Sequence, residues 1–188
     1  MQLADKVAVI TGAARGLGRA YAEALAAEGA AIIAADLNDC SDTVAAVESA
    51  GGRAVSSTVN VSDAASCEAM ASLAIDAFGR VDVLINNAAL YAGLKGARFE
   101  RLDEEQWDRV MQVNIKGTWL TSRAVVDHMR ASGGGSIINI ASLAAVFGLP
   151  YGLDYVASKA AVIGMTRGMA RELGAEHIRV NAVAPSAV

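Results

Sequence analysis

The stretch Lys6–Gly18, KVAVITGAARGLG, decides the fold of this chain. Its first half, Lys6–Thr11, is an apolar and β-branched run that predicts a strand buried in a sheet. An alanine-rich segment over Leu17–Glu28 predicts a helix. Between the two lies a turn rich in glycine, with Gly12, Gly16 and Gly18. A strand, a glycine turn and a helix in this order are typical of the start of a parallel α/β sheet.

The same alternation of strands and helices continues to the end of the chain. Further strands are predicted at Ala30–Ala35, Arg53–Val59, Val81–Asn86, Ser136–Ala141 and Ile178–Ala184. Further helices are predicted at Asp39–Ala50, Asp63–Phe78, Asp103–Ala131 and Asp154–Gly174. Strands that are apolar throughout predict a parallel sheet covered on both faces. We therefore expect one α/β domain over residues 1–188, a doubly wound Rossmann sheet with strand order 3-2-1-4-5-6.

Composition and charge exclude several classes of protein. Hydrophobic residues make up 54% and charged residues 19% of the chain, which excludes disorder. The net charge is −4, and the few basic residues are scattered, so neither nucleic acid nor a membrane is an expected partner. Cysteine and histidine are too few and too far apart for a metal site. The start of the chain does not resemble a secretory signal, and we expect a soluble, cytoplasmic protein.

The glycine turn is placed to bind a dinucleotide. Glycines let the backbone turn sharply, and they let N–H groups at the start of a helix approach a pyrophosphate. Asp36 follows the second predicted strand, 18 residues after Gly18. That offset is close to the roughly 20 residues expected for an acid that binds the ribose hydroxyls. We assign the cofactor contacts of this region to the residues Gly12, Arg15, Gly16, Leu17, Gly18, Asp36 and Leu37.

Asp36 also favours NAD over NADP. A carboxylate accepts hydrogen bonds from ribose hydroxyls but repels the additional phosphate of NADP. Leu37 and Asn38 offer no cation that would neutralise it. Arg15 is the residue that leaves NADP open, because its side chain could reach a phosphate from the glycine turn, although a solvated arginine is the simpler interpretation.

Two tyrosines precede a lysine by four residues, Tyr91 with Lys95 and Tyr155 with Lys159. Glycines around the first pair argue against a helix, whereas the second pair lies in a predicted helix, where such residues share a face. A phenol with a pKa of about 10 is a poor base, and a nearby ammonium lowers that pKa. We expect Lys159 to activate Tyr155 in this way, although Lys159 alone could equally be a surface lysine.

Ser142 follows the fifth predicted strand, so its hydroxyl is expected at the carboxyl edge of the sheet. There it could bind a substrate oxygen or a developing alkoxide. The alternative role of Ser142 is a plain cap at the end of the strand.

Taken together, these residues resemble the short-chain dehydrogenase/reductase family over essentially the whole chain. The resemblance is carried by TGAARGLG (Thr11–Gly18), Asp36, NNAA (Asn86–Ala89), Asn114 in VNIKG, Ser142, YVASK (Tyr155–Lys159) and VNAVAPS (Val180–Ser186). Several motifs in the correct order make the match specific, whereas each motif alone is weak.

The resemblance implies a role for each matched residue. Tyr155 would be the general acid/base, and Lys159 would lower its pKa and hold the nicotinamide ribose. Ser142 would orient the substrate, and Asn114 would hold a water of a proton relay. Further contacts with the cofactor would come from Asn87, Ala88, Pro185 and Val188.

The chain departs from the family pattern at several places. Asn60 and Val61 stand where the family usually has Asp-Val, and the Asn60 carbonyl can still accept from the adenine amine. NNAA replaces NNAG, and Pro185-Ser186 replaces Pro-Gly. Family members usually continue past the position of Val188 with a segment over the substrate, a helix and a further strand. We expect this C-terminal part to be absent here, either as a fragment, an omission from the sequence or a truncation.

The expected activity is hydride transfer between NAD(H) and a secondary alcohol or ketone, with a partly apolar substrate site. Tyr91, Leu94, Leu143, Ala144, Val146, Phe147 and Tyr151 are expected to line that site or to belong to the core. The alternatives are a reductase of 3-oxoacyl thioesters or sugars, and a dinucleotide-binding protein without catalysis. The resemblance further implies a homo-oligomer, a tetramer packed through the helices Asp103–Ala131 and Asp154–Gly174.

Overall fold

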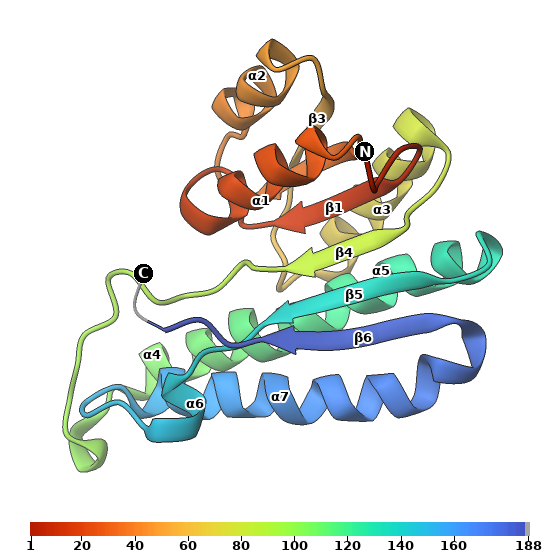
Figure 1. Cartoon of the computed structure of the whole chain (residues 1–188). Helices are drawn as coiled ribbons and strands as arrows, with labels where there is room; N and C mark the ends of the chain where they lie inside the picture. The colour runs from red at the N-terminus through yellow and green to blue at the C-terminus, as the bar shows by residue number, and fades with distance from the viewer. Residues whose placement is uncertain (187–188) are drawn as a thin grey trace.

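A computed structural model describes residues 1–186 and contains one six-stranded parallel sheet (Figure 1). The strands are β1 (Val7–Thr11), β2 (Ala31–Asp36), β3 (Arg53–Thr58), β4 (Val83–Asn86), β5 (Gly135–Ile140) and β6 (Ile178–Val183). Their order is β3-β2-β1-β4-β5-β6, and each neighbouring pair is parallel. The predicted doubly wound sheet and its strand order are confirmed.

Helices connect successive strands. They are α1 (Gly16–Ala27), α2 (Ser41–Ser49), α3 (Ala64–Phe78), α4 (Glu104–Val110), α5 (Thr118–Ala131), α6 (Ala144–Phe147) and α7 (Leu153–Leu173). Short helical turns form η1 (Phe99–Arg101), η2 (Met111–Gly117) and η3 (Gly174–Glu176). Within residues 1–186, none of the helices combines the length and the apolar character that a membrane span requires.

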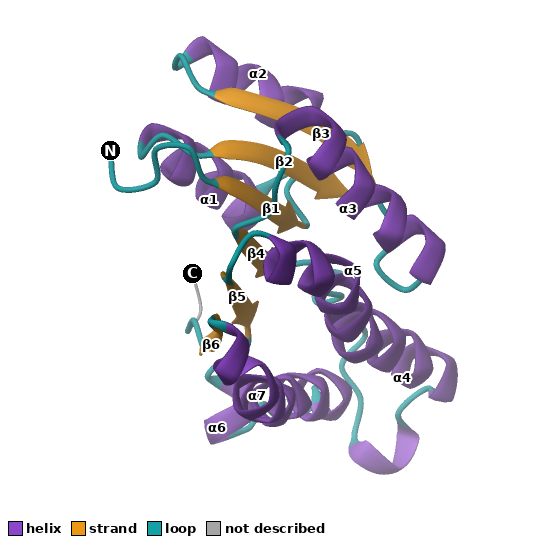
Figure 2. Ribbon diagram, turned by 90° about the vertical axis from the view of Figure 1, so that its right-hand side faces the viewer, coloured by secondary structure: helices purple, strands orange, loops and turns teal. Residues whose placement is uncertain are grey.

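Two apolar layers hold the helices against the sheet (Figure 2). On one face, side chains such as Ile33 and Leu84 pack against α3, α5 and α7. On the other face, side chains such as Ile10 and Ile32 pack against α1 and α2. Burial of these side chains supplies the main force for folding.

The prediction of strands that are apolar throughout is wrong for β3 and β6. Buried and exposed residues alternate along β3, and β6 is mostly exposed beyond Val180. Both strands lie at the edges of the sheet, where one flank has no neighbouring strand. The central strands β1 and β2 are buried almost throughout, as predicted.

The long helix predicted over Asp103–Ala131 is interrupted. It consists of α4 and α5 joined by η2, a π-helical turn that contains Asn114. A π turn widens the backbone hydrogen-bond ring and often marks a functional position in a helix. The pattern of apolar residues follows the overall helix and does not reveal this local change of hydrogen bonding.

The Asp82 carboxylate joins the segments before β1 and β4 at the amino end of the sheet, opposite to the edge that carries the motifs. Its carboxylate accepts hydrogen bonds from Lys6 Nζ at 3.0 Å, the Val7 N–H at 3.0 Å and Arg80 Nη2 at 2.6 Å. Burial alone would raise the pKa of Asp82, but the hydrogen bonds from Arg80, Val7 and Lys6 outweigh it and hold that pKa below its usual value.

We expect Asp82→Asn to lower the free energy of unfolding by about 2 kcal/mol at neutral pH, because a buried charged acceptor is lost. A depressed pKa stabilises the fold above the unfolded value of about 4, and this contribution disappears as the pH falls through the folded pKa. Urea unfolding of both proteins at neutral and acidic pH measures the difference. Equal stability at neutral pH would contradict the expectation.

Candidate active site

The carboxyl ends of the strands meet around one cavity of about 620 Å³. The glycine turn follows β1, the NNAA segment follows β4, and Ser142 follows β5 at this same edge (Figure 1). Residues from five parts of the chain line the cavity: Leu17, Asn87, Ala89, Tyr91, Ile140, Ala141, Ser142, Leu143, Ala144, Phe147, Gly148, Leu149, Tyr155, Lys159, Pro185 and Ser186. The fold thus brings the separate motifs of the sequence together.

The glycine turn combines close packing with an open surface. A Cβ on Gly12 would lie 2.8 Å from Asn87 Nδ2, and a Cβ on Gly18 would overlap the Gly12 carbonyl oxygen. Gly16 has a φ of +56° and nothing within 4 Å of the Cβ position, so its backbone is open to a ligand. Glycine at these places lets a phosphate group approach the N-terminus of α1.

The Asp36 carboxylate lies against the glycine turn. Its Oδ2 accepts a hydrogen bond from the Ala14 N–H at 3.1 Å, and its Oδ1 accepts one from the Asn38 N–H at 2.9 Å. Leu37 and Arg15 are both exposed beside it. The carboxylate is thus fixed beside the glycine turn, in which the backbone at Gly16 is open. This arrangement fits the ribose of a dinucleotide.

Two predicted cofactor residues lie after β3, outside the lining of the cavity. Asn60 Oδ1 accepts hydrogen bonds from the Ser62 N–H at 3.1 Å and from Ser62 Oγ at 2.7 Å. Asn60 Oδ1 is the oxygen that was expected to accept a hydrogen bond from the adenine amine. Both of its lone pairs are therefore engaged within the loop. Val61 is buried in the core.

Asn87 and Pro185, two of the predicted cofactor contacts, line the cavity. Asn87 Nδ2 donates to the carbonyl oxygens of Thr11 at 2.9 Å and Gly12 at 3.1 Å. The neighbouring Ala88 donates its N–H to Thr11 Oγ1 at 3.1 Å. The Pro185 carbonyl accepts the Leu143 N–H at 3.0 Å. Val188, the last predicted contact, lies outside the described residues.

Tyr155 and Lys159 lie on the first turns of α7, as predicted, and both line the cavity. Lys159 is 3% exposed, and its Nζ donates to the Ile140 carbonyl at 2.6 Å. The same Nζ lies 5.8 Å from the centre of the Tyr155 ring. Lys159 is therefore part of the site, and its interpretation as a surface lysine is wrong.

The expectation that Lys159 lowers the pKa of Tyr155 stays a prediction, because the net shift of that pKa in this structure is upward and has other causes. Burial raises the pKa of Tyr155, the hydrogen bond with Ser142 lowers it, and the neighbouring Tyr91 raises it further. Burial also lowers the pKa of Lys159 to about 8. The Lys159 ammonium donates to a backbone carbonyl and lies over the ring of Tyr155.

The Ser142 hydroxyl lies between the end of β5 and the short helix α6, which the sequence pattern did not predict. Its Oγ accepts the Ala144 N–H at 3.1 Å, and its predicted role toward a substrate oxygen stays a prediction. The same hydroxyl forms the hydrogen bond with Tyr155.

Asn114 connects the π turn to the loop after β4. Its Oδ1 accepts the Leu90 N–H at 2.7 Å, while its Nδ2 donates to the Leu90 carbonyl at 3.2 Å and to Ser158 Oγ at 3.0 Å. The side chain is only 1% exposed. Asn114 is thus a buried side chain that contacts Ser158, the residue before Lys159.

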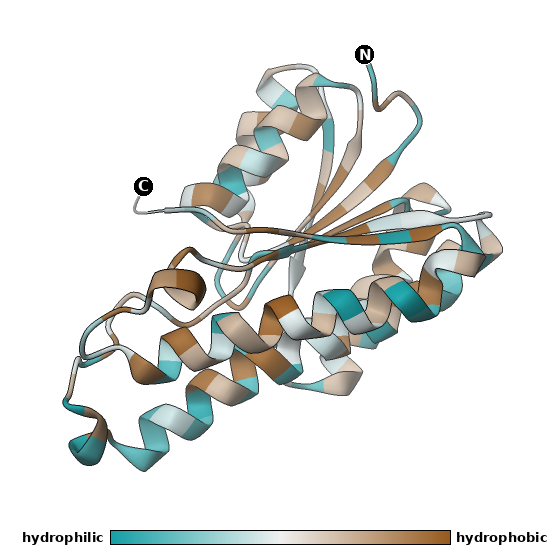
Figure 3. Ribbon diagram, turned by 60° about the horizontal axis from the view of Figure 1, so that its bottom comes forward, coloured by the Kyte–Doolittle hydropathy of each residue, from teal (hydrophilic) through white to brown (hydrophobic). Residues whose placement is uncertain are grey.

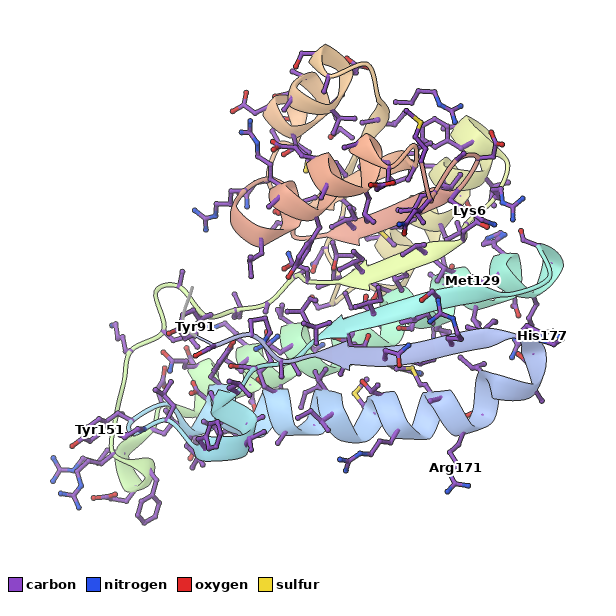
Figure 4. The ribbon with its side chains drawn as sticks, viewed as in Figure 1. Lys6, Tyr91, Met129, Tyr151, Arg171 and His177 are labelled. Carbon is purple, nitrogen blue, oxygen red and sulfur yellow. The ribbon has the colours of Figure 1, made fainter. Side chains whose placement is uncertain are left out.

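Tyr91 and Lys95 lie on a loop and not on one face of a helix, but Tyr91 itself lines the cavity. Its ring centre lies 4.7 Å from that of Tyr155, at an interplanar angle of 44°. Tyr91 lies on the loop after β4, near the carboxyl ends of the strands, whereas Tyr151 lies farther out (Figure 4). The sequence signalled Tyr91 only as one of several residues that could line a substrate site.

The comparisons with known proteins agree with this geometry. A family model described as short chain dehydrogenase matches residues 6–188. The chain belongs to the short-chain dehydrogenase/reductase family. A 3-oxoacyl-[acyl-carrier-protein] reductase of Thermotoga maritima is 40% identical over 187 residues, which cover 98% of this chain and 75% of that protein.

Other members of the family act on different substrates. D-threitol dehydrogenase of Mycolicibacterium smegmatis is 39% identical, and the match covers 100% of this chain and 72% of that protein. The crystal structure of carveol dehydrogenase from Mycobacterium avium in complex with NAD has a TM-score of 0.94 and 35% identity. That match covers 98% of this chain and 71% of the carveol dehydrogenase chain. The family therefore supplies the oxidoreductase class but not the substrate.

Proposed function

We propose that this chain is an NAD-dependent dehydrogenase of secondary alcohols, or a reductase of the matching ketones, with Tyr155 as the general acid/base. The observation that carries the proposal is the convergence of Ser142, Tyr155 and Lys159 on the cavity that borders the glycine turn. A dinucleotide-binding protein without catalysis would have no need for this set of side chains around one cavity. The nicotinamide, when bound, supplies the hydride chemistry.

Each polar group at the cavity has a distinct task in the proposed reaction. Tyr155 as phenolate removes the hydroxyl proton of the alcohol, and as phenol it returns a proton to the carbonyl oxygen. Ser142 donates a hydrogen bond to the same oxygen and stabilises its developing charge. Lys159, charged below a pH of about 8, contributes a positive charge beneath the ring of Tyr155. Asn114 keeps the neighbouring Ser158 and Leu90 in place, and we propose that it also supports a proton relay through water.

The cofactor assignment rests on the glycine turn and Asp36. The open Gly16 and the packed Gly12 and Gly18 fit a pyrophosphate at the start of α1. Asp36 would accept from the ribose hydroxyls, with Leu37 and Arg15 beside the adenosine and Leu17 near the cavity. Asn87, Ala88 and Pro185 would border the cofactor from the other side, whereas the bonds of Asn60 Oδ1 with Ser62 and the burial of Val61 do not favour their predicted contact with adenine. The NAD complex of the related carveol dehydrogenase supports this choice.

The walls of the cavity favour a partly apolar substrate. Leu143, Phe147 and Leu149 line it, and α6 is strongly apolar in Figure 3. Phe147 is 80% exposed, so a large apolar side chain faces solvent at the rim of the site. The reductase of 3-oxoacyl thioesters remains the second candidate, because the Thermotoga maritima relative carries that name.

We expect Tyr155→Phe to lower the rate of alcohol oxidation by about 10²- to 10⁴-fold, because the proton acceptor is lost. The binding of NADH should be retained, since the ring remains. A panel of secondary alcohols, sugar alcohols and 3-hydroxyacyl thioesters, followed through NADH production, identifies the substrate class. Equal rates for the wild type and the variant would rule out the assignment of Tyr155.

The same assay reads the pH dependence. Oxidation requires the phenolate, whose pKa is raised in this structure, so the rate should increase as the pH rises into the alkaline range. Ser142→Ala removes the hydrogen bond that lowers this pKa, and the rising limb should move to higher pH. A limb that stays in place or moves to lower pH would show that Ser142 does not act on the phenol.

We expect NADH to bind at least about tenfold more tightly than NADPH, because a like charge beside Asp36 costs more than the roughly 1.4 kcal/mol that this factor represents. Asp36→Ala should narrow the difference, and adding Leu37→Arg should reverse it. Fluorescence titration with each cofactor measures both effects. Tighter binding of NADPH to the wild type would overturn the assignment of Asp36.

We also propose that the chain forms a homo-oligomer through the groove between η2, α5 and α7. This groove of about 670 Å³ is lined by apolar side chains, among them Met111, Ile115, Trp119, Met165 and Met169. Trp119 is 47% exposed. Trp119→Glu should reduce the molar mass in solution measured by light scattering, while Phe99→Glu, an exposed control outside the groove, should not. A wild-type monomer would contradict the proposal.

A further inference from the structure

Two side-chain amides hold the loop between β4 and η1 against α7. The first is Asn114, which pairs with both backbone groups of Leu90 and reaches Ser158 on α7. The second is Gln106 on α4, which repeats this arrangement farther along the loop. Its Oε1 accepts the Lys95 N–H at 2.9 Å, and its Nε2 donates to the Lys95 carbonyl at 3.1 Å. Each amide thus bonds both the N–H and the carbonyl of one loop residue, as a neighbouring strand would in a sheet.

Gln106 also reaches the residue that precedes Tyr155. Its Nε2 donates to Asp154 Oδ2 at 2.8 Å, and Asp154 Oδ1 accepts the N–H of Tyr155 at 2.8 Å. Gln106 is 5% exposed and Asp154 1% exposed. A buried carboxylate needs hydrogen-bond donors, so this contact fixes the first turn of α7 relative to the loop.

Tyr91 lies between the two anchored positions. The turn that carries it is closed by a hydrogen bond from the Leu94 N–H to the Tyr91 carbonyl at 3.2 Å, and it contains Gly93 with a φ of +85°. Tyr91 is 59% exposed, so few neighbours hold its ring apart from Tyr155. The position of the ring therefore depends on the two ends of the loop.

We propose that Gln106 is a positioning residue: by holding Lys95 and Asp154 together it sets Tyr91 against Tyr155, so that Tyr91 forms a fixed wall of the cavity and selects substrates by their width. This proposal rests on the proposed function of Tyr155. Both tyrosines line the same cavity, and a substrate whose oxygen reaches Tyr155 must pass beside the ring of Tyr91. The anchoring by Asn114 alone leaves Gly93 and Gly96 free to bend the loop beyond Tyr91.

The experiment compares Gln106→Ala, Tyr91→Ala and the double variant. For each, kcat/KM is measured for a linear secondary alcohol and for one with a ring beside the carbinol carbon. Both single variants should shift the preference toward the wide substrate by about tenfold, the scale at which pocket shape discriminates. The double variant should shift it no further than Tyr91→Ala, because the two residues act through one wall. Independent, additive shifts, or no shift in Gln106→Ala, would overturn the proposal.

Two further variants separate positioning from a general loss of stability. Thr166→Val removes a buried hydrogen bond from Asn139 Nδ2, 2.9 Å long, elsewhere on α7. It should lower the melting temperature without changing the substrate preference. Gln106→Glu keeps the shape but places a second carboxylate against Asp154, and it should shift the preference as Gln106→Ala does. If the substrate preference changed in step with the melting temperature in all variants, the positioning role of Gln106 would be contradicted.

A titration of the phenols tests the same contact without turnover. The ultraviolet signal of phenolate in the wild type, minus that of Tyr155→Phe, reports the midpoint of Tyr155. Lys159 on α7, Ser142 after β5 and Tyr91 on the loop face this phenol, and Tyr91 raises its pKa. Tyr91→Phe and Gln106→Ala should therefore both lower the midpoint, and an unchanged midpoint in Gln106→Ala would overturn the proposal. A wild type that is inactive on every substrate would contradict the proposed function. The titration would still decide whether Gln106 positions Tyr91 against Tyr155.

Discussion

The hydrogen bonds between the ends of β1 and β4 are the constraint on which the rest of the site depends. Thr11 Oγ1 accepts the N–H groups of Asn87 and Ala88, while Asn87 Nδ2 donates to the carbonyls of Thr11 and Gly12. β1 and β4 are the neighbouring strands at which the strand order of the sheet reverses, and folds of this kind bind ligands at such a point. The bonds hold the glycine turn against the NNAA segment, so the two segments keep a fixed position relative to each other at this edge of the sheet.

The parallel sheet then determines which residues can act together. Because all six strands end at one edge, Ser142, the glycine turn and the loop with Tyr91 converge although they lie far apart in sequence. α7 contributes Tyr155 and Lys159 from a rigid helix, which fixes their spacing better than a loop would. In the proposed function, the loops contact the substrate and the helix carries the phenol that transfers the proton.

The sequence predicted the sheet, its order and several residues that line the cavity because these depend on strong local signals. Buried strands, glycine turns and the spacing of Tyr155 and Lys159 are visible without a structure. The π turn at Asn114, the short helix α6 and the exposed residues of the edge strands were not predicted. They follow from tertiary hydrogen bonds and from the position of a strand in the sheet, which periodicity does not contain. Gln106 was missed for the same reason, since a glutamine in an amphipathic helix has no distinctive pattern.

The electrostatics of the site depends on burial, which the spacing of residues along a helix does not contain. A lysine one helical turn from a tyrosine was expected to lower the pKa of the phenol, but both groups are buried. Burial favours the neutral form of each, so it raises the pKa of Tyr155 and lowers that of Lys159 to about 8. The hydrogen bond from Ser142 is the contact that opposes this effect on the phenol. Burial, Ser142 and Tyr91 thus act on the pKa of Tyr155, and none of these influences is visible in the spacing of Tyr155 and Lys159 along the helix.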